Sequence, residues 1–223
     1  IEDIAKHCEG IAAIVGGPCI NNSKKGKKLS NAAYFLKDGQ ISSIHKKQLL
    51  PTYDVFDENR YFEAGVLASG VEYLGERIAI TICEDLWNIP SSNLYKRSPM
   101  EQLSIEKPDF IVNIAASPFA QGQLQNRADV FRWNAEEYQI PIFYVNHVGA
   151  QTELIFDGGS CVIGKTGALI DQLPFFEEQM KYFETKSLET ADQTPPPAQL
   201  QLIESALVLG IKDYFRKLNF EAA

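Results

Sequence analysis

Short apolar runs, each closed by turn residues, recur along the chain and limit the folds open to it. They are rich in isoleucine and valine and span residues 11–15, 77–83, 109–114 and 140–146. Runs of this length are typical of strands buried on both faces of a sheet, so we expect Gly16-Gly17-Pro18 to close the first of them. The sequence therefore predicts a domain built around buried strands.

The segments between these runs alternate between helical and hairpin patterns. Apolar residues recur at helical spacing over residues 1–8 and 123–139, and Ser98-Pro99 offers the cap and first residue of a further helix. Paired strands are predicted over residues 31–47, where Asp38-Gly39 supplies the turn, and again over 71–83 and 160–170. A mixture of hairpins and helical crossovers predicts a layered α/β domain with packed sheets inside and helices outside.

Composition excludes several classes of protein. With 45% hydrophobic and 22% charged residues among 223, the chain is neither disordered nor collagenous. Its formal net charge of −8 repels phosphate backbones and anionic lipid, and no apolar run reaches the ~18 residues of a membrane span. We expect a cytoplasmic protein that has neither nucleic acid nor membrane as its partner.

Cysteine and histidine usage argues against a metal, disulfide or redox site. The four cysteines form no CxxC pair, and only three histidines are present. We expect no metal and no cofactor in this domain.

The carboxyl-terminal part of the sequence predicts a linker followed by a single helix. Residues 190–198 contain Pro195-Pro196-Pro197, which favours an extended conformation, and residues 199–223 carry one amphipathic pattern. The chain also begins with Ile1 rather than Met. We interpret residues 1–189 as one domain, truncated at its amino end, and residues 199–223 as the start of another.

Cys83 is the candidate nucleophile, because it stands where a buried strand stops and a turn begins. Such a position exposes a side chain and points the next backbone N–H to the same spot. A working thiol also needs a nearby cation, which Lys47, at the end of the preceding hairpin, can supply. On the residues alone, a small buried cysteine that only packs remains the alternative.

Four longer motifs carry a resemblance to a known family. KQLLPTYDVFDENRYFEAG from Lys47 and ITICEDLW around Cys83 resemble the amidase domain of glutamine-dependent NAD+ synthetases, in the nitrilase or carbon–nitrogen hydrolase superfamily. IVNIAASPF and YVNHVGAQTELIFDGGS are similar too. The tail ESALVLGIKDYFRKLNF resembles the helix leading into the ATP-dependent synthetase domain of the same family.

The resemblance implies a four-layer αββα sandwich with a Glu–Lys–Cys triad. Cys83 would attack the side-chain amide of glutamine. Lys47 would hold its ammonium near the sulfur and keep it ionised, and together with the backbone N–H after Cys83 it would stabilise the oxyanion. The ammonia released would serve the ATP-dependent conversion of nicotinic acid adenine dinucleotide to NAD+ in a synthetase domain. ATP and magnesium are implied for that domain, whose signature is absent from this chain.

The third member of the triad is the point of departure from the family. Its general-base glutamate precedes the helix that opens this chain, so we expect that glutamate to be missing and the fragment to be inactive. Glu2 and Glu9 are weak candidates to replace it.

Binding residues follow from the resemblance as well. Tyr53 matches a tyrosine lining the glutamine pocket, Glu84 the acceptor of the substrate α-amino group, and Ser117 a polar pocket group. An exposed loop position for Glu84 and a turn role for Ser117 are the alternatives. Arg127 is predicted either to pair with a carboxylate or to lie on a solvated helix face.

Three functions stay open on the sequence. The first is the glutaminase portion of a glutamine-dependent NAD+ synthetase. The second is a stand-alone amidase or nitrilase of the same superfamily, and the third is a catalytically silent assembly domain. Superfamily members commonly pair through this domain, so we expect at least a dimer.

Overall fold

The computed structural model describes residues 1–188 and 197–220, which fall into two units, Ile1–Ile114 and Ala115–Ala223. The first contains α1 (Glu2–Ala5), β1 (Ala12–Ile20), β2 (Leu29–Lys37), β3 (Gln40–Lys46), α2 (Glu58–Tyr61), β4 (Val71–Tyr73), β5 (Glu76–Ile82), α3 (Pro99–Leu103) and β6 (Phe110–Ala115), which ends at the boundary. It also has 3₁₀ turns η1 (Cys83–Leu86), η2 (Pro90–Ser92) and η3 (Ser104–Glu106). The second contains α4 (Gln123–Tyr138), β7 (Ile142–Asn146), β8 (Val148–Gln151), β9 (Leu154–Asp157), β10 (Cys161–Ile163), β11 (Leu169–Gln172) and α5 (Gln199–Leu218).

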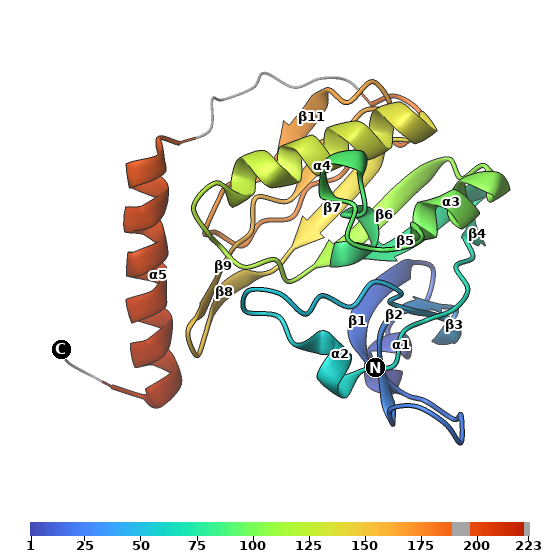
Figure 1. The fold of residues 1–223 in the computed structure, drawn as a ribbon, viewed down its shortest axis with the longest axis horizontal. Helices are drawn as coiled ribbons and strands as arrows, with labels where there is room; N and C mark the ends of the chain where they lie inside the picture. The colour runs from blue at the N-terminus through green and yellow to red at the C-terminus, as the bar shows by residue number, and fades with distance from the viewer. Residues whose placement is uncertain (189–196, 221–223) are drawn as a thin grey trace. The chain divides into compact units, whose positions relative to one another are not determined.

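Two sheets face each other in the first unit. One is the antiparallel sheet β1-β2-β3, and in the other β5 pairs antiparallel with β4 and parallel with β6. Side chains alternate along β2: Tyr34 packs with Ala5 and Cys8 of the α1 segment, whereas Phe35 meets Tyr73 of β4 with ring centroids 6.0 Å apart. In Figure 1, α3 lies next to β5 and β6 on the side away from β1, β2 and β3. The predicted α/β fold is confirmed.

β1 differs from its predicted form. The Gly16-Gly17-Pro18 sequence does not close the strand, which continues to Ile20 and pairs with β2 throughout. β1 is the edge of its sheet, where a proline without an N–H is tolerated. Two-sided burial was also wrong, because Cys19 alone is buried in this strand. A Cβ on Gly16 would lie 3.3 Å from the Ile114 side chain, so glycine allows the close approach of β6.

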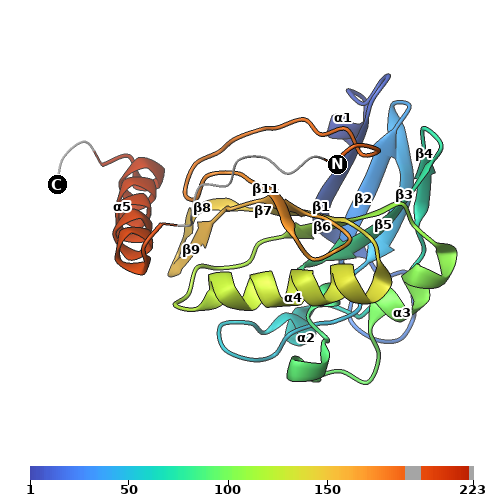
Figure 2. The ribbon, with the colours of Figure 1, turned by 90° about the horizontal axis from the view of Figure 1, so that it is seen from above.

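The second unit packs one long helix on strands. α4 lies along one side of β7, β10 and β11 (Figure 2), and its Phe131 ring stands 4.5 Å from that of Tyr144. The β8–β9 hairpin is an element that we did not predict. The predicted helix of the tail is present as α5, which lies beside this hairpin (Figure 1), with Leu202, Ala206 and Asp213 buried. The predicted linker lies outside the described residues up to residue 196.

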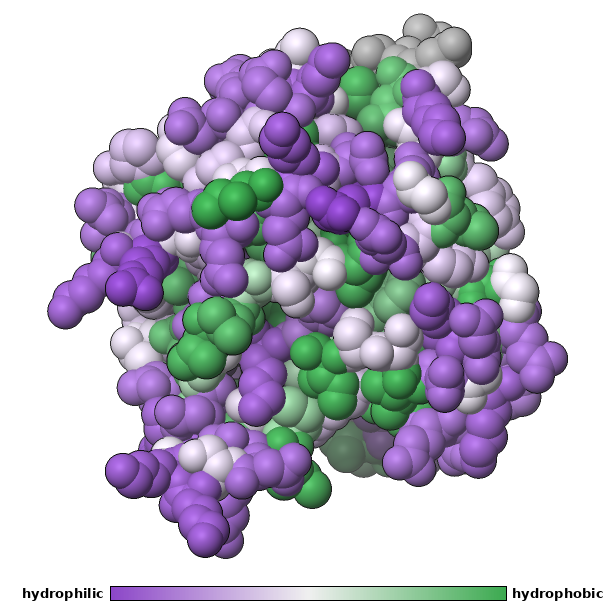
Figure 3. Space-filling view, turned by 90° about the vertical axis from the view of Figure 1, so that its right-hand side faces the viewer, coloured by the Kyte–Doolittle hydropathy of each residue, from purple (hydrophilic) through white to green (hydrophobic). Residues whose placement is uncertain are grey.

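The surface seen in Figure 3 is mostly hydrophilic, with apolar side chains in separate small groups. In residues 1–188 and 197–220, no helix combines the length and apolar character that crossing a membrane requires.

A buried ion pair holds the second unit together around Ser117. Arg127 of α4 donates two 2.8 Å hydrogen bonds to Asp157 of β9, and both side chains are 3% exposed. Asn146 donates to Asp157, and its own Oδ1 accepts from the Ser117 N–H at 2.9 Å. Of the two interpretations left open for Arg127, the carboxylate pair is therefore correct.

Removing this arginine should strongly destabilise the chain. Arg127→Met leaves Asp157 buried without its cation, so we expect a loss of ~3–5 kcal/mol in the free energy of unfolding. The double variant Arg127→Met/Asp157→Asn should lose less. Arg132→Met is the matched control, because its pair with Asp129 is more than half exposed. Urea unfolding followed by Trp133 fluorescence measures all three, and equal losses for Arg127→Met and Arg132→Met would contradict the argument.

Candidate active site

Cys83 occupies a strained backbone position at the end of a buried strand. β5 runs parallel to β6, and its last five residues are buried. Directly after it Cys83 takes a φ of 44°, a left-handed conformation that residues with a Cβ seldom adopt, and opens turn η1. The side chain is partly exposed, whereas the other three cysteines are buried. This strand-to-turn elbow is the position predicted for a nucleophile.

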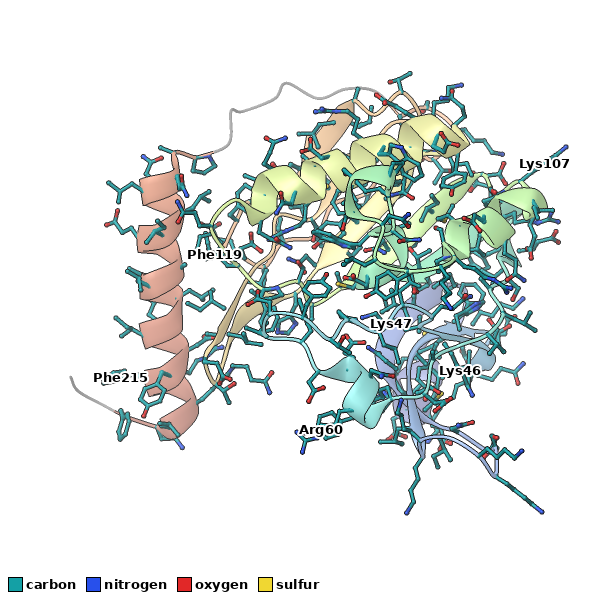
Figure 4. All side chains as sticks on the ribbon, viewed as in Figure 1. Lys46, Lys47, Arg60, Lys107, Phe119 and Phe215 are labelled. Carbon is teal, nitrogen blue, oxygen red and sulfur yellow. The ribbon has the colours of Figure 1, made fainter. Side chains whose placement is uncertain are left out.

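Lys47 is held beside this elbow by its backbone and by one carboxylate. Its N–H donates to Asn31 of β2, its carbonyl accepts from Gly65, and each bond is 2.8 Å long. The side chain is 1% exposed and donates to Glu58 Oε1 at 2.6 Å. Figure 4 shows Lys47 near α2, the short helix that carries Glu58. A buried ammonium needs such a partner, because an unpaired charge in the interior is expensive.

Glu58 is a site residue that the sequence reasoning missed. It is the first residue of α2, and its side chain is 21% exposed. In the described part of the chain its Oε2 is buried without a hydrogen-bond partner, which leaves an acceptor open at the site. The signal was in the sequence, since Glu58 lies eleven residues after Lys47 within the same motif. The acidic candidates predicted from the sequence, Glu2 and Glu9, lie instead near the amino end.

Glu84, next to the candidate nucleophile, forms a polar cluster with two tyrosines. Tyr53 donates to its carboxylate at 2.9 Å and Tyr95, which we did not predict, at 3.0 Å. Glu84 is 3% exposed, so the exposed-loop alternative is wrong. Burial raises the pKa of this carboxyl, while the phenols and Lys47 act in the opposite direction. The structure thus places Tyr53 and Glu84 together beside Cys83, and their contacts with substrate stay predictions.

Asp85 ties the Lys47 segment to the end of β5. Its Oδ1 accepts from the backbone N–H groups of Gln48 and Leu49, each at 3.0 Å, and its Oδ2 accepts from Ile82 at 3.1 Å. Asp85 was not among the residues predicted for the site. Burial raises its pKa to about 6, against the effect of these three N–H groups and of Lys47.

The groups around Cys83 act on its thiol in two directions, so the expectation that Lys47 keeps it ionised stays a prediction. Burial is the largest influence on the thiol and raises its pKa to about 11. Lys47 lowers that pKa, so its charge does act on the sulfur, but Glu84, Glu58 and Asp85 raise it. A base or an added positive charge therefore favours the ionisation of Cys83.

The remaining predicted residues lie elsewhere. Glu2 and Glu9 are exposed, the first on α1 and the second just beyond it. Ser117 belongs to the second unit, where it is 3% exposed and bound through its backbone to Asn146, so its predicted contact with substrate stays a prediction. Among the described residues no group of three or more His, Cys, Asp and Glu side chains is placed to hold a metal ion.

A cysteine at a strand end, beside a buried lysine–glutamate pair in a layered α/β fold, has the groups that thiol-dependent acyl transfer requires. The chain belongs to the carbon-nitrogen hydrolase family, whose sequence model matches residues 3–193.

Relatives and solved structures agree with this assignment. The chain is 37% identical over 205 residues to a glutamine-dependent NAD(+) synthetase of Synechocystis, covering 88% of this chain and 37% of the relative. The structure of glutamine-dependent NAD+ synthetase from Acinetobacter baumannii matches with a TM-score of 0.84 and 31% identity, covering 96% of this chain and 40% of that one. A carbon-nitrogen hydrolase from Helicobacter pylori, 19% identical, shares the fold with a TM-score of 0.64 over 78% of this chain and 61% of its own. The predicted resemblance is confirmed, and the chain spans well under half the length of these synthetases.

The charge on Glu58 should slow alkylation of Cys83. Glu58→Gln removes one of the negative charges that raise the thiol pKa, while the amide oxygen can still accept from Lys47. We expect the pKa of Cys83 to fall below 11 and its reaction with iodoacetamide at neutral pH to become several-fold faster. Mass spectrometry of the labelled peptide measures this rate against pH. Glu63→Gln is the control, and an unchanged or slower rate for Glu58→Gln would contradict the charge argument.

Asp85 should make stability fall as pH rises from about 4 to 6. Its carboxyl titrates near 3.8 when unfolded and near 6 when folded, so the folded chain binds the extra proton within that window. The contribution to the free energy of unfolding should decrease by on the order of 2–3 kcal/mol across it and then level off. Asp85→Asn should abolish this component. Urea unfolding at several pH values, followed by Trp87 fluorescence, gives the slope, and identical slopes would contradict the prediction.

Proposed function

We propose that this domain hydrolyses the side-chain amide of glutamine, with Cys83 as nucleophile. The observation that carries the proposal is the convergence of Cys83, a buried Lys47–Glu58 pair and the Tyr53–Glu84–Tyr95 cluster in one unit. Membership of the carbon-nitrogen hydrolase family supports it independently.

The chemistry is acyl transfer through a thioester. Cys83 gives its proton to a general base and Sγ attacks the amide carbon, forming a tetrahedral oxyanion. The C–N bond then breaks, and the nitrogen leaves as ammonia after taking up the proton. Water attacks the thioester in a second addition, which releases glutamate and restores the thiol.

Each neighbour of Cys83 has a part in these steps. Lys47 and the backbone N–H of Glu84 face the developing oxyanion, where a fixed donor is typically worth ~10²–10³ in rate. Glu58 orients Lys47, and its open Oε2 is an acceptor for the substrate amide or the departing ammonia. By the resemblance, the general base is a glutamate on a segment of the polypeptide that precedes Ile1.

Glu84 gives the site a reason to prefer an amino acid over a simple amide. Its carboxylate, oriented by Tyr53 and Tyr95, is a partner for the α-ammonium group of glutamine. Glu84 is also one of the charges that raise the pKa of Cys83. A bound ammonium offsets this charge, so binding of glutamine favours thiolate formation.

The proposed product and partner rest on the relatives, which are glutamine-dependent NAD+ synthetases much longer than this chain. We infer that ammonia passes to a synthetase domain of the same polypeptide, which uses ATP and magnesium to convert adenylated nicotinic acid adenine dinucleotide to NAD+. We also propose a homo-oligomer, for which light scattering after size exclusion is the test. A monomer alone would contradict it.

Replacing the sulfur should abolish hydrolysis. In the full polypeptide encoded by the reading frame of this chain, Cys83→Ala should reduce ammonia release from glutamine to background, because no nucleophile remains. Cys8→Ala is the matched control, since Cys8 is buried against the outer face of the three-stranded sheet. NAD+ synthesis with added ammonium salts should survive in both variants. Ammonia release by a folded Cys83→Ala variant would refute the proposal.

A panel of amides separates glutamine hydrolysis from the general amidase alternative. Higher kcat/KM for a neutral amide than for glutamine would favour a stand-alone amidase. No hydrolysis of any amide, together with alkylation of Cys83 no faster than that of Cys8 or Cys19, would favour a silent assembly domain.

A further inference from the structure

A buried asparagine on β6 reaches across to the backbone of the candidate nucleophile. Asn113 is 1% exposed, and its Nδ2 donates to the Cys83 carbonyl at 3.3 Å and to Thr81 Oγ1 at 2.9 Å. The carbonyl oxygen can only accept, so the amide group must turn its nitrogen toward it. This contact joins residues that are thirty positions apart in the sequence.

The Cys83 carbonyl is half of a peptide group whose other half matters for catalysis. The described residues contain no cis peptide, so the C=O of Cys83 and the N–H of Glu84 lie in one rigid plane and point in opposite directions. A donor that fixes the carbonyl direction therefore fixes the N–H direction as well. That N–H is the backbone donor assigned to the oxyanion.

The backbone here needs such a support. Cys83 has a φ of 44°, and strained conformations of this kind persist only where the surroundings over-determine them. Rotation of the 83–84 peptide would turn the N–H away and present a carbonyl oxygen to the oxyanion instead.

The asparagine is poorly explained by stability alone. In residues 1–188 and 197–220 its Oδ1 is buried without a hydrogen-bond partner, a state that costs folding free energy. An apolar residue of similar size would avoid that cost, which favours a role for the Nδ2 donor.

We propose that Asn113 is a positioning residue that orients the Cys83–Glu84 peptide so that its N–H faces the oxyanion. The inference rests on the proposed acyl-transfer function. Asn113 acts through the backbone of Cys83 rather than on the substrate, so its loss should lower kcat and leave KM for glutamine unchanged.

Two reactions of the same sulfur test this role in the full polypeptide. Glutamine hydrolysis passes through an oxyanion, whereas displacement of iodide from iodoacetamide by the thiolate develops no such charge. Asn113→Leu keeps the approximate shape and removes both donated bonds. We expect kcat to fall by ~10-fold or more, up to the ~10²–10³ that complete loss of an oxyanion donor costs. The alkylation rate at a given pH should be unchanged.

Asn134→Leu is the matched control, because Asn134 is also 1% exposed and lies in α4, outside the unit that holds the candidate nucleophile. It should leave both reactions of Cys83 at the wild-type rate. Thr81→Val is a milder second variant, since it removes the oxygen that holds Nδ2 in place, together with a long 3.4 Å bond to the Val112 carbonyl, and it should lower kcat in the same selective way. If Asn113→Leu does not fold, this variant decides.

An unchanged kcat, or alkylation slowed in proportion to kcat, would overturn the positioning role. Failure of the proposed function looks different, because the wild-type polypeptide would then release no ammonia from glutamine or would still do so after Cys83→Ala.

Discussion

The ion pair between Lys47 and Glu58 is the interaction on which the site depends. Lys47 is almost fully removed from solvent, and an ammonium left there without an acceptor or a nearby carboxylate would be lost as a charge or would not be buried at all. Glu58 offsets the desolvation of the lysine and fixes the direction of its ammonium. Glu58 is the first residue of α2, a helix of four residues between β3 and β4, so the pair also ties this segment to Lys47.

The rest of the site is organised by side chains that hydrogen-bond to the backbone. Asp85 joins the segment after Lys47 to the end of β5, and Asn113 joins β6 to the turn that begins with Cys83. Both residues are buried, and neither is a nucleophile or a cation. Each brings together chain segments thirty or more residues apart, which lets a strained Cys83 keep a single conformation.

The sequence predicted what local pattern or motif can encode. The buried strand that ends at Cys83 follows from its apolar run, and the hairpin turn at Asp38-Gly39 follows from turn chemistry. Tyr53 and Glu84 came from the resemblance and do meet, with a hydrogen bond that spans 31 positions. Tyr95 was missed because its contact depends on how the loop after η1 folds back, and Asn113 because its contact depends on the pairing of β5 and β6, and no periodicity records either.

Edge position accounts for the error in β1. Glycine and proline at positions 16–18 normally end a strand, but a strand with a neighbour on one side only needs half of its backbone donors. The sequence cannot tell an edge strand from a central one without the strand order. The β8–β9 hairpin was also not predicted, because the family motif in its segment says nothing about strand pairing.

The charges around Cys83 connect selectivity with reactivity. Lys47 lowers the pKa of the Cys83 thiol and three carboxylates raise it, so ionisation of the sulfur depends on the balance of these charges. A substrate that brings an ammonium to Glu84 shifts that balance toward the thiolate, and a neutral amide of the same length does not. On the proposed function, discrimination between the two would include the rate of the chemical step as well as binding, because the ammonium that identifies glutamine would also help to create the nucleophile. A site with a permanently ionised thiol would lack this link, and its sulfur would be open to oxidation and alkylation whenever glutamine was absent.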